Sequence, residues 1–152
     1  IYVSSFFPIA ENSTGPSAPE RHRAPALERG RTMHALIIEQ DAWVVLMIED
    51  ALRELGYGSF AVATTLGEAI EAAEHQCPDL ITSDIRLGSE NGLDAVQAIC
   101  SQRPLPVVFV TATGWEARER DPDLIVVQKP FQQSDLKGAV IAARESCPSA
   151  PA

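Results

Sequence analysis

The chain has 152 residues, of which 45% are hydrophobic and 22% are charged, a composition that fits one globular domain with short tails. The formal net charge is −9, and nearly all of the excess acid lies after residue 33, which argues against nucleic-acid binding. No apolar run approaches the roughly 18 residues of a membrane span, and the three cysteines match no metal-site spacing. We therefore expect a cytoplasmic domain with free thiols that binds neither nucleic acid nor membrane.

Residues 1–33 are rich in proline, serine, glutamate and arginine without a sustained period, which predicts a disordered N-terminal extension. The chain begins with isoleucine, and Met33 stands immediately before the first strand-like run. Two interpretations stay open at this point: a disordered arm of the natural protein, or sequence upstream of a natural start at Met33. The intact mass of the protein from native cells distinguishes them.

From His34 onward, continuous apolar runs alternate with amphipathic segments. The runs predict strands at about 35–38, 60–63, 80–83, 107–110 and 124–127. The amphipathic segments predict helices at about 42–55, 65–75, 91–101, 115–119 and 132–145.

This alternation requires a parallel sheet with helices on both faces, joined by right-handed crossovers. The expected fold is the flavodoxin-like doubly wound sheet of five strands in the order 2-1-3-4-5. The folded domain is expected over 34–145, followed by a disordered tail, 146–152.

Polar residues stand where the predicted strands end: Glu39 and Gln40 after the first, Asp84 after the third, Thr111 after the fourth and Lys129 after the fifth. Parallel strands end at one edge of the sheet, so these side chains are expected to converge. Each residue alone also fits an ordinary role, such as a solvated glutamate, a turn threonine or the lysine before a helix start. Their joint placement at four strand ends is what points to a functional site.

These residue types together are suited to Mg²⁺ binding and phosphoryl transfer. Two carboxylates and a backbone carbonyl suit Mg²⁺, and Asp84 is able to attack phosphorus and hold a phosphoryl group as an acyl phosphate. Mg²⁺ and the Lys129 ammonium would neutralise charge on the transferring group. The Thr111 hydroxyl offers a hydrogen bond to a phosphoryl oxygen, and the small Ala112 leaves the pocket open.

Four segments together carry a close resemblance to the receiver domain of bacterial two-component response regulators. They are the acidic motif at 37–41, the phosphoacceptor motif at 83–87 with its loop at 91–93, the threonine motif at 108–112 and the lysine-proline motif at 128–131. The likeness covers about 34–145. The stretch 106–115 also resembles the "FAT GUY" receivers, in which a glycine-containing segment replaces much of the fourth helix.

The resemblance implies that Asp84 accepts a phosphoryl group from a histidine kinase or a phosphotransfer protein. Glu39, Asp84 and the Arg86 backbone carbonyl would face Mg²⁺. The phosphoryl group would be bound by Thr111, Ala112 and Lys129, and the Lys129–Pro130 peptide bond would be cis. Such a protein is a signalling switch rather than an enzyme, because it promotes only its own phosphorylation and dephosphorylation.

The expected output of this stand-alone receiver is a contact with a downstream protein. The surface formed by the fourth helix, fifth strand and fifth helix would make that contact, with Trp115 and Phe131 near it. The same surface would serve a homodimer.

Three residues depart from the family pattern. Gln40 stands where the family usually has a second acid, so Mg²⁺ affinity is expected to be weak or lost there. Val126 stands where many receivers have an aromatic switch residue, which puts coupling by aromatic rotation in doubt. Arg86 is expected to reach the acidic pocket and to pair with Glu39 when metal is absent.

Two alternatives stay open. A pseudo-receiver, which keeps the fold and binds partners without phosphorylation, is favoured by Gln40. A phosphatase of the haloacid dehalogenase type also uses an aspartate after a strand, but it requires a second aspartate two positions later, where this chain has Arg86.

Overall fold

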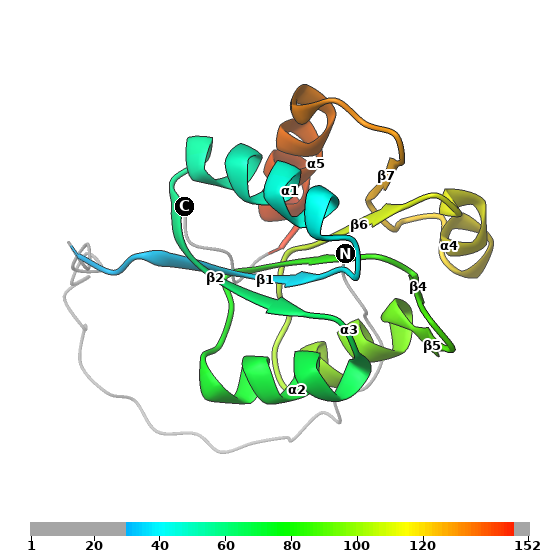
Figure 1. The fold of residues 1–152 in the computed structure, drawn as a ribbon, viewed down its shortest axis with the longest axis horizontal. Helices are drawn as coiled ribbons and strands as arrows, with labels where there is room; N and C mark the ends of the chain where they lie inside the picture. The colour runs from blue at the N-terminus through cyan, green and yellow to red at the C-terminus, as the bar shows by residue number, and fades with distance from the viewer. Residues whose placement is uncertain (1–29, 148–152) are drawn as a thin grey trace, which may run out of the picture.

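The computed structural model describes residues 30–147. The predictions for residues 1–29 and 148–152 lie outside this range. Strands and helices alternate along the chain except at β3, β4 and β5, which follow one another (Figure 1). The elements are β1 Met33–Ile38, α1 Ala42–Glu54, β2 Tyr57–Ala63, α2 Leu66–His75, β3 Leu80–Ser83, β4 Arg86–Leu87, β5 Glu90–Asn91, α3 Gly92–Cys100, β6 Val107–Thr111, α4 Gly114–Arg120, β7 Val126–Gln128 and α5 Gln133–Ser146.

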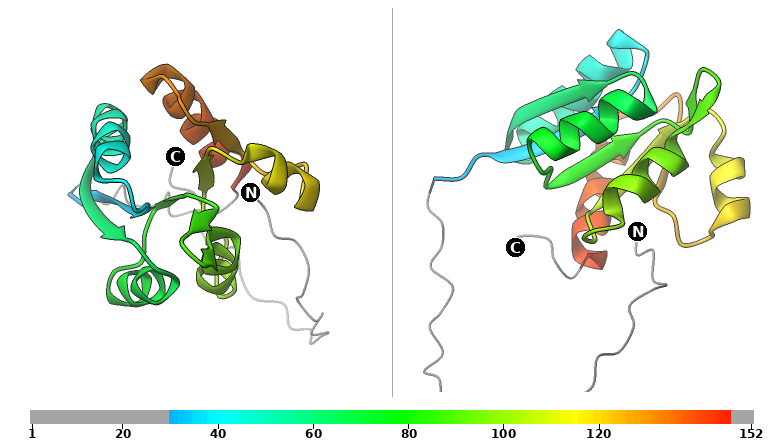
Figure 2. Two further views of the ribbon diagram at one scale, coloured as in Figure 1. Left: turned by 45° about the vertical axis from the view of Figure 1, so that its right-hand side comes forward. Right: turned by 90° about the horizontal axis from the view of Figure 1, so that it is seen from below.

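Five strands form one parallel sheet in the order β2-β1-β3-β6-β7. This confirms the predicted doubly wound fold and its strand order. Helices α1 and α5 cover one face of the sheet, and α2 and α3 cover the other (Figures 1 and 2). Helix α4 lies at the β6–β7 side, beside the small antiparallel hairpin of β4 and β5 (Figure 1).

The core consists of two apolar clusters, one on each face of the sheet. Along β1, Leu36 and Ile38 belong to one cluster, and Ala35 and Ile37 belong to the other. All four are at most 1% exposed. A strand covered on both faces has no solvent side, which explains why the strand sequences are continuously apolar rather than alternating.

The structure differs from the predicted element boundaries in a few places. Strand β1 begins at Met33, inside the segment that was expected to be disordered, and helix α5 continues to Ser146 in the predicted tail. The β4–β5 hairpin lies where no strand was predicted. Its turn contains Gly88 at a φ of 62°, a conformation that glycine adopts without strain. No helix within residues 30–147 has the length and apolarity to cross a membrane.

Candidate functional site

The carboxylate of Asp84 lies just beyond the end of β3 and is held there by the backbone around it. The Asp84 N–H donates to the Ile38 carbonyl at 2.9 Å, and Ser83 Oγ donates to the Asp84 carbonyl at 2.8 Å. A Cβ atom placed on Gly92 would lie 1.8 Å from the Asp84 carbonyl oxygen, so only glycine allows α3 to begin this close. The Asp84 side chain is 15% exposed and therefore reachable from solvent.

Lys129 joins the ends of three strands. Its Nζ donates to Glu39 Oε2 at 2.6 Å and to Asp84 Oδ2 at 2.9 Å. The Lys129 side chain is 18% exposed, and its backbone N–H donates to the Thr111 carbonyl at 2.9 Å. The Lys129–Pro130 peptide bond is cis, in agreement with the prediction. The structure thus brings Glu39, Asp84 and Lys129 into direct contact, although each is at least 45 residues from the next in sequence.

The Glu39 side chain is buried, with 4% of its surface exposed. Both of its carboxylate oxygens accept hydrogen bonds. Its Oε1 accepts hydrogen bonds from the backbone N–H groups of Gln40 and Asp41, both at 2.9 Å. Its Oε2 takes the Lys129 ammonium. Asp41 is the N-cap of α1, because its Oδ1 accepts hydrogen bonds from the Trp43 and Val44 N–H groups.

The protonation of Lys129 is set by two opposing effects. Burial lowers the pKa of the Lys129 ammonium, but the hydrogen bonds and charges of Glu39 and Asp84 outweigh it and raise this pKa above its ordinary value. The ammonium is therefore fixed in its charged form at neutral pH. Two carboxylates share this single cation, which leaves one excess negative charge at the site.

Thr111 ends β6 and is 1% exposed. Its Oγ1 accepts from the Thr113 N–H at 3.2 Å and lies 3.2 Å from Thr113 Oγ1. The hydroxyl is thus engaged with the loop that leads to α4. The neighbouring Ala112 is exposed, and its carbonyl accepts a hydrogen bond from Gln128 Nε2 at 2.7 Å.

One prediction about Arg86 is wrong. Its guanidinium does not pair with Glu39 but forms an ion pair with Glu116 on α4. Lys129 already occupies the free oxygen of Glu39, and the Arg86 side chain is 65% exposed on the outer side of the β4 strand. Only the backbone of Arg86 contacts the site, through an N–H that lies 3.3 Å from Asp84 Oδ1. Glu116 raises the pKa of the Arg86 guanidinium.

Gln40 is exposed and does not contribute a charge to the site. Its Nε2 donates to the Thr64 carbonyl at 3.2 Å. Within residues 30–147 no three His, Cys, Asp or Glu side chains gather as a metal-binding group. The Glu39 and Asp84 carboxylates, which share the Lys129 ammonium, supply hard oxygen donors of the kind that Mg²⁺ prefers, but they are a sparse set.

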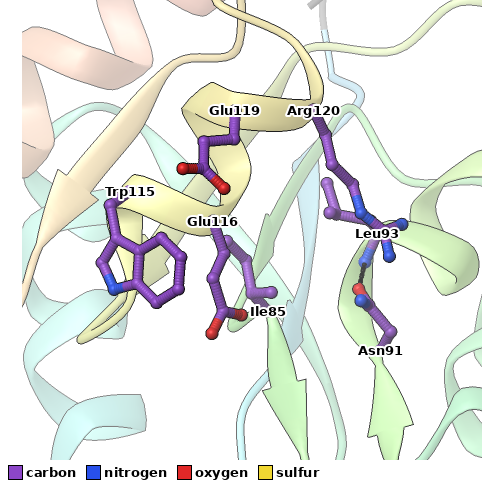
Figure 3. Close-up of a pocket in the computed structure, with 7 residues that line it drawn as sticks. All are labelled: Ile85, Asn91, Leu93, Trp115, Glu116, Glu119 and Arg120. Atoms are coloured by element: carbon purple, nitrogen blue, oxygen red, sulfur yellow. Dashed lines mark hydrogen bonds between the residues drawn. The ribbon is translucent and has the colours of Figure 1, made fainter.

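A cleft of about 440 Å³ lies between α4 and the β5–α3 junction. Figure 3 shows the α4 side chains on one wall and those of the β3–α3 region on the other: Trp115, Glu116, Glu119 and Arg120 face Ile85, Asn91 and Leu93. Trp115 was predicted to lie near a contact surface, but the cleft and the roles of Glu116 and Gln128 were not predicted from the sequence. A charged segment after Thr111 and a polar residue before Lys129 were the only signals for the last two.

Comparison with known proteins identifies relatives across the folded part of the chain. Residues 35–141 match the family described as the response regulator receiver domain. The chain is 36% identical over 109 residues to the transcriptional regulatory protein PdtaR of Mycobacterium tuberculosis, covering 69% of this chain and 53% of that protein. It is 32% identical over 126 residues to the phyllosphere-induced regulator PhyR of Methylorubrum extorquens, covering 76% of this chain and 47% of PhyR. It thus spans about half the length of these relatives.

Solved structures of response regulators also superimpose on this chain. The receiver domain of the Erythrobacter litoralis PhyR response regulator superimposes with a TM-score of 0.71 at 32% identity, covering 80% of this chain and 96% of that one. The PhyR stress response regulator superimposes with a TM-score of 0.69 at 33% identity, covering 78% of this chain and 47% of that chain.

Proposed function

Because this chain belongs to the receiver domain family of response regulators, we propose that it is a phosphoacceptor switch that carries its phosphoryl group on Asp84. Two-component signalling by phosphorelay is general to the family, and receiver domains are signalling modules rather than enzymes. The observation that carries the proposal is the Lys129 ammonium, which lies 2.6 Å from Glu39 and 2.9 Å from Asp84. This places a fixed positive charge beside the carboxylate that would be modified.

The donor in this proposal is a phosphohistidine of a histidine kinase or of a phosphotransfer protein. An Asp84 carboxylate oxygen attacks phosphorus, the phosphorus–nitrogen bond breaks, and the imidazole leaves with the electron pair and takes a proton. Lys129 pairs with a phosphoryl oxygen in the product. Mg²⁺, held by Glu39, Asp84 and the Arg86 carbonyl, would supply positive charge to the transferring group when bound.

Thr111 would register the new group. In the present structure its hydroxyl bonds to Thr113. We propose that it turns to a phosphoryl oxygen after transfer, with Ala112 leaving room for that oxygen, and that this shifts the loop before α4. A downstream protein or a second copy of the chain would recognise the changed surface of α4, β7 and α5, where Trp115 and Phe131 lie.

The test is a mass measurement. Incubation of the chain with acetyl phosphate and MgCl₂ is expected to add one phosphoryl group, and Asp84→Asn is expected to abolish the addition. Asp94→Asn is a matched control, because it makes the same change at an exposed aspartate of α3. Equal mass gain in wild type and Asp84→Asn, or none in either, would overturn the assignment.

A second candidate is a pseudo-receiver that binds partners without phosphorylation. It is favoured by the exposed Gln40, whose amide bonds to Thr64, and by the small number of acidic side chains at the site. It predicts that binding to the partner is unchanged by Asp84→Asn and by omission of Mg²⁺. The phosphoacceptor proposal predicts that both changes remove the response.

A further inference from the structure

The N-terminal turn of α4 is tied to the phosphoacceptor site by two polar side chains. Arg86, two residues after Asp84, forms an ion pair with Glu116 in the first turn of α4. Gln128, the residue before Lys129, donates to the Ala112 carbonyl at 2.7 Å and accepts from the Gly114 N–H at 3.2 Å. Arg86 itself contacts Asp84 through its backbone N–H, and Gln128 is the neighbour of Lys129, which contacts Asp84. Both of these ties to α4 therefore start beside the phosphoacceptor site.

Gln128 does for α4 what an N-cap residue would ordinarily do. Thr113 occupies the N-cap position but makes no side-chain capping bond, because its hydroxyl lies against Thr111. The Gln128 amide instead accepts from the Gly114 N–H, one of the otherwise unpaired donors of a helix start. The fit is close, since a Cβ atom on Gly114 would lie 2.7 Å from Gln128 Oε1.

Helix α4 depends on such ties because it is short. It has seven residues, well below the length of about 12 at which isolated helices become stable in water. Its buried contacts are few, with Ala117 and Gly114 as its buried residues. Its position is therefore set largely by what holds its first turn.

The Arg86–Glu116 ion pair and the Gln128 hydrogen bonds are expected to respond differently to phosphorylation. The Arg86 and Glu116 side chains are 65% and 25% exposed, and ion pairs that are exposed to solvent contribute little to stability. A phosphoryl group on Asp84 would offer Arg86 a stronger, doubly charged partner with several acceptor oxygens. The Gln128 bonds carry no charge and do not respond to the phosphoryl group directly.

We propose that the Arg86–Glu116 ion pair is a latch that phosphorylation of Asp84 opens, and that α4 then turns about the Gln128 hydrogen bonds and reshapes the cleft that Trp115 lines (Figure 3). This inference rests on the proposed phosphorylation of Asp84. In it, the Arg86 guanidinium leaves Glu116 for the phosphoryl oxygens. Arg86 is thus a positioning residue that converts a charge change at Asp84 into movement of α4.

Trp115 reports on this movement. The chain has two tryptophans, and Trp43 is 72% exposed on α1, so Trp43→Phe leaves Trp115 as the only one at little cost. In this background, Arg86→Ala and Glu116→Gln are expected to shift the unphosphorylated Trp115 emission toward that of the phosphorylated parent. The further change caused by acetyl phosphate and MgCl₂ is expected to fall at least about twofold. The double swap R86E/E116R re-forms an ion pair and is expected to restore the unphosphorylated emission.

Two controls and one parallel measurement make the test decisive. Arg118→Ala removes an exposed arginine from the same helix, and Gln97→Ala removes an exposed glutamine from α3; both are expected to behave like the parent. Intact mass measures phosphorylation of every sample. Phosphorylated Arg86→Ala with the full parental Trp115 response overturns the latch alone. Absence of mass gain in the parent overturns the proposed function, and the latch with it.

The hinge role of Gln128 is measured separately. Hydrogen exchange at the Gly114 amide is expected to speed up about fivefold in Gln128→Ala, the change that corresponds to one hydrogen bond of about 1 kcal/mol. Gln128→Glu keeps the acceptor and is expected to retain most of the protection. Equal exchange in the parent and Gln128→Ala would rule out the hinge.

Discussion

The two edges of the sheet each bury a carboxylate against a cation, but they balance charge differently. At the edge where the strands begin, Asp79 is 5% exposed, accepts the His34 N–H at 2.8 Å and pairs with Arg31. At the edge where the strands end, Lys129 pairs with Glu39 and Asp84 together. Within residues 30–147, the ion pair at the first edge joins one anion to one cation, whereas the ion pairs at the second edge join two anions to one cation.

The unequal charge balance distinguishes a buried acid with a structural role from one that is suited to chemistry. The Asp79 carboxylate does not share the Arg31 cation with a second acid and also accepts a backbone N–H, so its charge is balanced. Two carboxylates around one ammonium keep a residual attraction for positive charge, a feature typical of functional sites. If burial were the only criterion, Asp79 would be a stronger candidate for a functional acid than Asp84. Charge balance makes Asp84 the stronger candidate.

Phosphorylation should distinguish Asp84 from Asp79 most sharply. Asp84→Asn is expected to abolish phosphoryl incorporation from acetyl phosphate completely, whereas Asp79→Asn is expected to retain it, because Asp79 lies at the opposite edge of the sheet. Intact mass after a fixed incubation gives both results. Loss of incorporation in a folded Asp79→Asn protein would show that charge balance does not distinguish the two edges.

The next effect separates them by stability. Asp79→Asn is expected to lower the free energy of unfolding by about 1–3 kcal/mol, because it weakens a buried, charge-assisted hydrogen bond. Arg31→Ala is expected to cost about 1 kcal/mol or less, since the Arg31 side chain is 55% exposed. Denaturant unfolding followed by circular dichroism measures both. A larger loss in Arg31→Ala than in Asp79→Asn would contradict the assignment of Asp79 as the buried anchor.

The same contrast explains what the sequence could predict. The continuous apolar strands gave the sheet and its order, and the position of Glu39, Asp84 and Lys129 at strand ends was enough to predict their convergence, since parallel strands end at one edge. Side-chain direction was not predictable in this way. The sequence predicted that Arg86 lies next to the site, but it did not predict the direction of the Arg86 side chain. Its partner Glu116 lies 30 residues away on a separate helix.

The β4–β5 hairpin escaped prediction for a different reason. Its strands are two residues each and contain Arg86, Glu90 and Asn91, so they carry no apolar run and no alternation. The ion pair of Arg31 with Asp79 was equally hidden, because Arg31 lies in a stretch whose composition is typical of disorder. Long-range polar contacts of this kind leave no local pattern in a sequence.

A moderate effect tests the excess charge by increasing it. Gln40→Asp is expected to bind Mg²⁺ at least about tenfold more tightly, because a third carboxylate would join the oxygen donors. Titration of Trp43 fluorescence measures this, since Trp43 is near the start of α1, just after residues 39–41. Gln76→Asp adds the same charge at an exposed position beyond α2 and serves as the control. Equal Mg²⁺ affinity in the two variants would exclude position 40 from the metal site.

The pH dependence of stability should distinguish the two edges by a smaller effect. Burial lowers the pKa of the His34 ring below its ordinary value of 6.5, so the unfolded chain binds that proton more tightly. The contribution of His34 to stability is therefore complete above about pH 6.5 and falls as the pH decreases. At Lys129 burial acts in the same direction, but Glu39 and Asp84 reverse it and raise the pKa above 10.5. That contribution is complete below about pH 10.5 and is lost as the pH rises through the raised pKa.

The two edges should therefore lose stability in opposite pH windows. Lys129→Gln is expected to flatten the alkaline limb of the pH–stability curve, and His34→Gln is expected to flatten the acidic limb just below pH 6.5. Lys137→Gln, which removes the lysine that pairs with Glu54 on the surface, controls for the loss of a lysine. Denaturant midpoints across the pH range provide the measurement. If Lys129→Gln and Lys137→Gln change the alkaline limb equally, the two carboxylates do not hold the Lys129 proton, and the charge imbalance at that edge has no energetic effect.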